Sequence, residues 1–189
     1  HAIGTRVLIV VPSPVGRLTP PADIPMERLW ENAVSNIRAA ADYAQQKNMY
    51  LAIEAINRYE TFFTNTMEKA YKMARDINHP HVGVMADTFH MNLEEADMER
   101  SLRMVADKLL HVHLADNTRE PPGMGSTDFH RVLRTLKDIN YTGLLCMEFM
   151  PQVSDPYASM QEGSQSALMD RYARSAIEFM KKVEREVTR

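Results

Sequence analysis

The chain alternates short apolar runs with longer amphipathic stretches whose apolar positions recur at helical spacing. This alternation predicts repeated βα units and therefore a parallel sheet. The runs expected to form strands are Arg6 to Val11, Tyr50 to Ile56, Val82 to Ala86, Leu109 to Leu114 and Gly143 to Phe149. The stretches expected to form helices are Met26 to Lys47, Thr66 to Ile77, Met98 to Lys108, Asp128 to Ile139 and Ser166 to Val187. Because the runs are apolar at nearly every position, we expect the strands to be buried on both faces.

Two architectures bury parallel strands in this way, the TIM barrel and the doubly wound sheet. In this chain, polar residues able to bind a metal lie at the C-terminal ends of four of the five expected strands. A TIM barrel assembles its active site from such strand ends, whereas a doubly wound sheet concentrates it at one crevice. We therefore predict an α/β fold of the TIM-barrel type. No low-complexity tract or linker interrupts the chain, so residues 1–189 are interpreted as a single domain.

The composition favours a small-molecule substrate. A net charge of −3 supplies no basic field for a phosphate backbone, so we expect no nucleic-acid partner. The apolar run from Val7 to Val11 is too short to cross a bilayer, and we expect neither a membrane helix nor a signal peptide. Cys146 is the only cysteine and cannot form an internal disulfide, which favours a reducing, cytoplasmic location.

The four polar strand ends are Glu54, Asp87, His113 and Glu148. Taken singly, a strand-end aspartate is usually a helix cap, and a strand histidine is usually a satisfied core residue. Together they offer three carboxylates and one imidazole from four successive strands, a ligand set suited to one divalent ion, with Mn²⁺ expected first and Mg²⁺ or Co²⁺ as alternatives. Glu54 and Glu148 would face one another across the mouth of an eight-strand barrel, with room for a substrate carbon between them.

Four segments carry a family resemblance: Ile53 to Glu60, Asp87 to Asn92, His113 to Arg119, and Met147 to Phe149. With these motifs in this order, the chain resembles the xylose-isomerase-like TIM barrels, and most closely the ketose 3-epimerases. The resemblance implies that Glu54 and Glu148 are the acid/base pair as well as metal ligands, and that Asp87 and His113 complete the metal site. It also implies that three further residues contact the sugar hydroxyls, namely Glu60, His90 and Arg119.

The implied chemistry is epimerisation at C3 of a ketose. A divalent metal bound by the ketone and the neighbouring hydroxyl acidifies the carbon-bound proton between them and stabilises the resulting enediolate. Two bases on opposite faces then suffice to invert the carbon. One glutamate alone would serve a 1,2-aldose–ketose isomerase, and that activity, a sugar-phosphate isomerase, an inosose dehydratase and a catalytically incompetent sugar- or metal-binding fragment all stay open. An endonuclease-IV-like protein is disfavoured, since it would need more metal-binding histidines and a basic face.

The resemblance begins at the family's fourth strand. We therefore expect these five βα units to be strands 4 to 8 of a (β/α)8 barrel that lacks its first three strands. The start at His1 and Ala2, rather than at a methionine, agrees with the loss of upstream residues. Absent strands would leave an apolar edge, so we expect a homo-oligomer.

Several other residues with chemical potential are assigned no role. His111 is expected to be packed one layer below His113, and Cys146 to be a small residue of the barrel interior. His130 is interpreted as a residue of a helix surface. The loop from Gly123 to Ser126 could cradle an anion through its backbone N–H groups, but its glycines are better explained by turn geometry, so a free sugar is preferred over a phosphorylated one.

Overall fold

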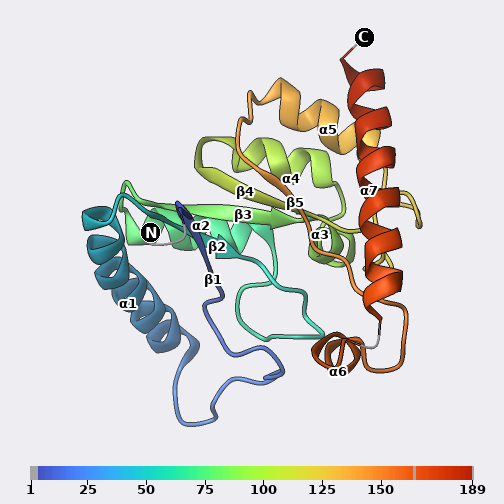
Figure 1. Ribbon diagram of the computed structural model, residues 1–189. Coiled ribbons are helices and arrows are strands. Elements are labelled where there is room, and N and C mark those ends of the chain that lie inside the picture. The colour runs from blue at the N-terminus through green and yellow to red at the C-terminus, as the bar shows by residue number, and fades with distance from the viewer. Residues whose placement is uncertain (1–3, 164, 189) are drawn as a thin grey trace.

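The computed structural model describes residues 4–163 and 165–188. Five strands form one parallel sheet in the order β1-β2-β3-β4-β5, and the sheet curls as an open half-barrel (Figure 1). Their bounds are β1 Val7–Val10, β2 Tyr50–Glu54, β3 Val82–Asp87, β4 Leu109–Leu114 and β5 Leu145–Met147. The predicted βα alternation and the parallel sheet are therefore confirmed.

Helices follow the strands as predicted, with two additions. The bounds are α1 Met26–Gln46, α2 Met67–Ile77, α3 Thr88–Glu94, α4 Met98–Met104, η1 Ala106–Lys108, α5 Phe129–Asp138, α6 Pro156–Gln161 and α7 Ser166–Val187. The sequence pattern missed α3 and α6, which are too short to show a clear period, and joined α4 to the 3₁₀ turn η1. Thr66 and Asp128 lie just outside their helices, where each caps the N-terminus by accepting a backbone N–H.

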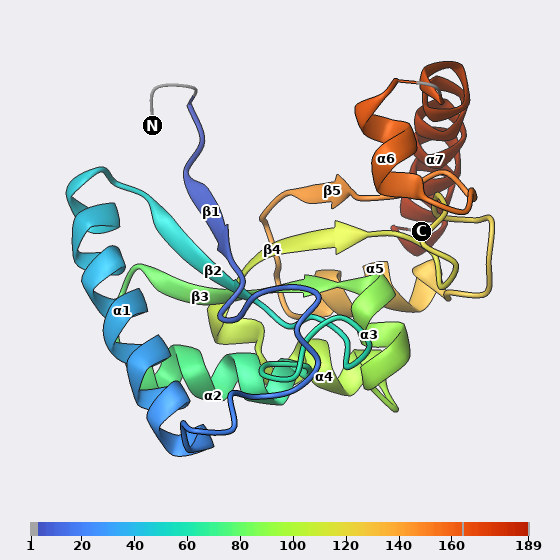
Figure 2. The same ribbon diagram turned by 90° about the horizontal axis from the view of Figure 1, so that it is seen from below.

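The core lies between one face of the sheet and the helices. Figure 2 shows α1, α2 and α4 together on that side. Ile53, Val84 and Val112 of the three central strands are fully buried there, and Met73 and Ile77 of α2 pack in the same cluster. Alternate residues of each strand point to the other, concave face, which carries the polar strand ends.

An irregularity between β3 and β4 decides which β4 residues reach the concave face. Val84 pairs with Leu109, but Met85 pairs with His111, so the register shifts by one residue there. After the shift Asp87 pairs with His113. Without this shift, His111 and His113 would point to the opposite face of the sheet.

Burial on both faces was predicted for all five strands and is wrong for the two at the sheet edges. β2 and β3 are buried almost throughout, whereas Leu8 of β1 is 45% exposed and Leu144, next to β5, is 75% exposed. Each edge strand has only one neighbour to cover it. The same exposure corrects the prediction for Cys146, which lies on β5 and is exposed rather than interior. The expected apolar edge is present on both sides of the sheet.

Within the described ranges, no helix combines the length and the apolar character needed to cross a membrane.

Candidate metal and sugar site

The fold brings the four predicted strand-end residues to one place. Glu54 is the last residue of β2 and Asp87 the last of β3, while His113 lies one residue before the end of β4. Glu148 follows β5, and its backbone N–H donates to the carbonyl of Leu114, which keeps the chain paired beyond the strand. Asp87 also caps α3 by accepting the N–H of Phe89, so this short helix fixes the position of its carboxylate.

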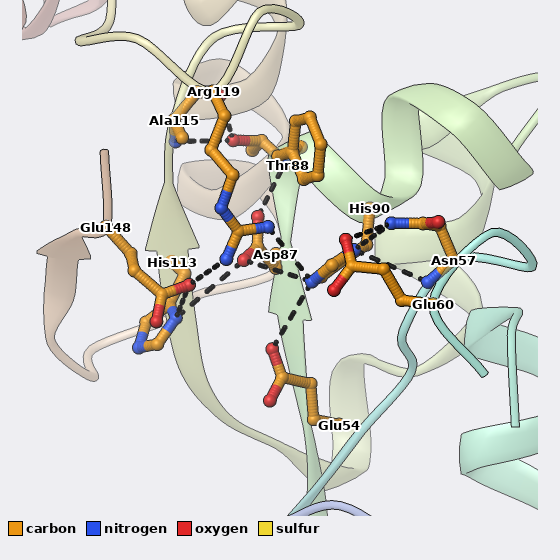
Figure 3. A network of polar contacts seen from close by, with 11 residues as sticks. Glu54, Asn57, Glu60, Asp87, Thr88, His90, His113, Ala115, Arg119 and Glu148 are labelled. Carbon is orange, nitrogen blue, oxygen red and sulfur yellow. Dashed lines mark hydrogen bonds and ion pairs between the residues drawn. The ribbon is translucent and has the colours of Figure 1, made fainter. Parts of the chain in front are cut away.

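The ligand atoms of Glu54, Asp87, His113 and Glu148 all lie within 4.8 Å of one another (Figure 3). His113 Nδ1 is 3.2 Å from Glu148 Oε2 and 3.8 Å from Asp87 Oδ2. Both Asp87 Oδ2 and His113 Nδ1 are buried without a well-aligned hydrogen bond, a costly condition that a bound cation would relieve. Three carboxylates and one imidazole at this spacing fit a hard divalent ion.

The pKa values of the carboxyl groups also favour a bound cation. Burial raises the pKa of Glu54 to about 7, and the negative charges of Asp87 and Glu148 add to that rise. Burial also raises the pKa of Asp87 to about 6, although the charge of Arg119 opposes the rise. These carboxyls are difficult to ionise together without a positive charge between them, and a divalent cation would supply it.

Glu148 differs from its two neighbours. Burial alone would raise its pKa, but the close contact with His113 and the charges of His113 and Arg119 lower it to about 2. The imidazole responds in the opposite direction: burial lowers the pKa of His113, and the contact with Glu148 more than offsets this and raises it. The two glutamates of the cluster therefore have very different proton affinities.

The predicted sugar contacts Glu60 and His90 are linked through Asn57. The Asn57 amide donates to Glu60 Oε1 at 2.8 Å and lies 2.8 Å from His90 Nδ1. Because Asn57 Oδ1 is already occupied by the Tyr59 N–H, the amide nitrogen must be the group that faces His90. His90 Nδ1 is then an acceptor, so the neutral ring carries its hydrogen on Nε2. Nε2 lies 3.9 Å from both Glu54 Oε1 and Asp87 Oδ2, at the mouth of the metal cluster.

Arg119 lies over the cluster from a loop. Its guanidinium donates to Glu148 Oε2 at 2.9 Å (Figure 3). The guanidinium carbon also lies 4.5 Å from the centroid of the Phe89 ring, over its face. Its Nη1 lies 3.3 Å from His90 Nε2, but both nitrogens carry hydrogen in this tautomer, so the contact is not a hydrogen bond. Its backbone has a φ of 62°, a strained conformation for a residue with a side chain. Such strain persists only when the surrounding loop enforces it.

Asp116 is the residue that organises this loop, and sequence reasoning missed it. Its buried carboxylate accepts the backbone N–H groups of Asn117, Gly123, Gly125 and Thr127. The loop suggested as an anion cradle thus already holds an internal carboxylate, so an external phosphate would find these amides occupied. The signal in the sequence was a charged residue two positions after the end of a buried strand and before a glycine-containing turn.

The remaining histidines are separate from the cluster or at its margin. His130 lies partly exposed on α5, with Nε2 2.7 Å from Glu186 Oε2 of α7, which confirms the predicted surface position. His111 stacks edge-on against His113, with ring centroids 5.0 Å apart.

Known proteins with similar sequences and folds share this architecture. A family model described as "Xylose isomerase-like TIM barrel" matches residues 1–183. A D-psicose 3-epimerase of Enterocloster bolteae is 36% identical over 158 residues, covering 80% of this chain and 52% of the relative. An L-ribulose 3-epimerase of Methylomonas sp. is 35% identical over 129 residues, covering 68% and 45%.

Among solved structures, a D-allulose 3-epimerase from Methylomonas sp. superimposes with a TM-score of 0.82 at 30% identity, over 96% of this chain and 64% of that protein. The chain thus spans about half the length of the curated relatives it matches. The resemblance predicted from the sequence motifs is confirmed.

Proposed function

Because the chain belongs to the xylose isomerase-like TIM-barrel family, we propose that its site serves the C3 epimerisation of a ketose. The observation that carries this proposal is the meeting of two glutamates from separated strands at one cluster of metal-binding atoms. Glu54 reaches it from β2 and Glu148 from the end of β5, so a sugar carbon placed between them would have a base on either face. The relatives named for D-psicose and L-ribulose support a ketose as the substrate class.

The four residues Glu54, Asp87, His113 and Glu148 would hold the cation, and Mn²⁺ is the ion we propose. When bound, it would act as a Lewis acid that favours loss of the carbon-bound proton beside the ketone. Its charge would also bring Glu54 and Asp87 into their ionised forms near neutral pH. Glu54 and Glu148 would then remove the proton on one face and return one on the other.

The neighbouring groups would orient the sugar. The Nε2–H of His90 is directed by Asn57 toward the cluster, where it would donate to a hydroxyl or to the ketone oxygen. Glu60 would accept a hydroxyl hydrogen, and Arg119 would donate while holding Glu148 in place. A free sugar fits better than a sugar phosphate, since the backbone N–H groups of Gly123 and Gly125, which could have held a phosphate, already donate to Asp116.

A second candidate function is sugar and metal binding without turnover. The specific observation behind it is the exposed apolar surface on β1 and β5, together with the chain's coverage of only about half of its relatives. We propose that the five βα units correspond to strands 4 to 8 of an eight-strand barrel. The concave face is then open where three further strands would form part of the pocket wall. Association of the chain with itself through these edges is part of the same proposal.

Proton exchange separates the two candidates. The 189-residue chain is loaded with Mn²⁺ and given D-psicose in deuterated water, and loss of the C3 proton signal is followed by NMR after the metal is removed. An epimerase exchanges this proton, and Glu148→Gln abolishes the exchange while His130→Gln, a control on the surface of α5, preserves it. Saturable sugar binding without exchange favours the binding module. Exchange that survives in Glu148→Gln contradicts the role given to Glu148.

A further inference from the structure

A second group of metal-binding side chains lies beside the first on the concave face. His111, His113 and Cys146 each offer a ligand atom, and these atoms lie within 4.8 Å of one another. His113 and Cys146 are direct neighbours across the β4–β5 pair, and His111 precedes His113 by two residues on the same face. The register shift after Val84 is what turns both histidines to this side.

Two of these side chains have no other partner. In residues 4–163 and 165–188, neither the imidazole of His111 nor the thiol of Cys146 forms a hydrogen bond or ion pair; His111 only stacks against the ring of His113. Cys146 is exposed, because β5 is an edge strand, and is therefore open to an ion from solution. Nδ1 of His113 faces Glu148 and Asp87, and Figure 3 shows the other ring nitrogen on the side away from Asp87.

We propose that His111, His113 and Cys146 form a second cation site that takes a soft divalent ion, Zn²⁺ above all. One thiolate and two imidazoles are a ligand set that zinc prefers, whereas Mn²⁺ and Mg²⁺ prefer oxygen. In a tetrahedral site two ligands of one zinc ion stand about 3.3–3.6 Å apart, so side-chain movements of about 1 to 1.5 Å bring the three ligand atoms into place around it. Water fills the fourth position, and the Cys146 thiol releases its proton to the solvent on binding.

His113 belongs to both sites, so the two sites are coupled. An ion at the soft site withdraws electron density from the imidazole of His113 or occupies its ligand nitrogen. Either effect weakens the binding of a hard ion by Glu54, Asp87 and Glu148. Zinc is therefore expected to act as an inhibitor of Mn²⁺ loading through Cys146. The existence of the soft site does not depend on the proposed epimerase activity.

Cobalt absorption tests the site directly, since Co²⁺ replaces Zn²⁺ and a thiolate ligand gives it an intense near-ultraviolet charge-transfer band. Reduced protein is titrated with Co²⁺ in four forms: wild type, Cys146→Ser, His111→Phe and Asp87→Asn. The wild type is expected to show the band with one equivalent bound at the thiolate, and Zn²⁺ should remove it. Cys146→Ser and His111→Phe should lose the band, while Asp87→Asn, altered only in the hard site, should keep it.

Two results would overturn the proposal. Absence of the charge-transfer band in the wild type with Co²⁺ in excess over both sites excludes thiolate ligation. A band that persists in His111→Phe shows that Cys146 binds the ion without the built site. Circular dichroism of each variant verifies its fold, and paramagnetic resonance of Mn²⁺ verifies that Cys146→Ser, changed at an exposed position, retains the hard site. Failure of sugar proton exchange with the cobalt band intact would count against the proposed function alone.

Discussion

Replacing Glu54 by glutamine should make the metal-free protein more stable, and more so as the pH rises. In the folded chain burial and the nearby carboxylates raise the pKa of Glu54 to about 7, from an ordinary value of 4.5. Below pH 4.5 the group is protonated in both states and the two proteins are similar. As the pH rises toward 7, the unfolded chain loses the proton of Glu54 while the folded chain retains it, so the free energy of unfolding of the wild type falls. The glutamine variant has no proton to lose at this position, so its stability does not fall for this reason.

The difference amounts to about 1 kcal/mol at pH 5 and about 3 kcal/mol at pH 8.5. Urea unfolding of both proteins in EDTA, at the two pH values, measures it. Excess Mn²⁺ should reverse the order at pH 8.5, because the ion stabilises the folded wild type and the variant has lost one ligand. A stability difference that does not change with pH, or a variant that Mn²⁺ stabilises as strongly as the wild type, would refute the reasoning.

Two further substitutions test the supports of the site. Asp116→Asn replaces one carboxylate oxygen by an NH₂ group that cannot accept a hydrogen bond, which leaves two backbone N–H groups of the loop unpaired. The free energy of unfolding measured with urea should fall by on the order of 3 kcal/mol, and proteolysis near Gly123 should be faster. A stable, protease-resistant variant would contradict the role of Asp116. Gly83→Ala would place a Cβ 2.3 Å from the carbonyl oxygen of Lys108, beside the register shift. The free energy of unfolding should fall by about 3 kcal/mol or more, and Mn²⁺ should bind more weakly because His113 is displaced. An unchanged Mn²⁺ affinity would show that the register shift does not position His113.

The amphipathic pattern predicted the larger elements because strands and long helices bury faces with a fixed period. It failed at α3, where seven residues follow Asp87 without an apolar stripe, and at β1 and β5, whose apolar residues are exposed because no further strand covers them. A run of apolar residues indicates that a strand can be buried. It does not indicate that the partner strand lies within the same chain.

The candidate site divides in the same way. Parallel strands bring their C-terminal ends to one edge, so Glu54 and Asp87 could be predicted to converge from their positions alone. The role of Asn57 depends on the side chains of His90 and Glu60 that lie beside it, and the role of Asp116 on the backbone N–H groups of its loop. Both arrangements exist only after the loops have folded. Cys146 was placed in the interior by its parity with Glu148. The parity was right, and the exposure follows from the open edge.

We propose that the four strand-end side chains share one hard cation. Anomalous diffraction from crystals grown with Mn²⁺ tests it most directly, since the ion is located independently of the protein coordinates. We expect one strong peak within about 2.0–2.6 Å of oxygen or nitrogen atoms from Glu54, Asp87, His113 and Glu148. The absence of a peak there, or a peak bound by only one or two of these residues, would contradict it.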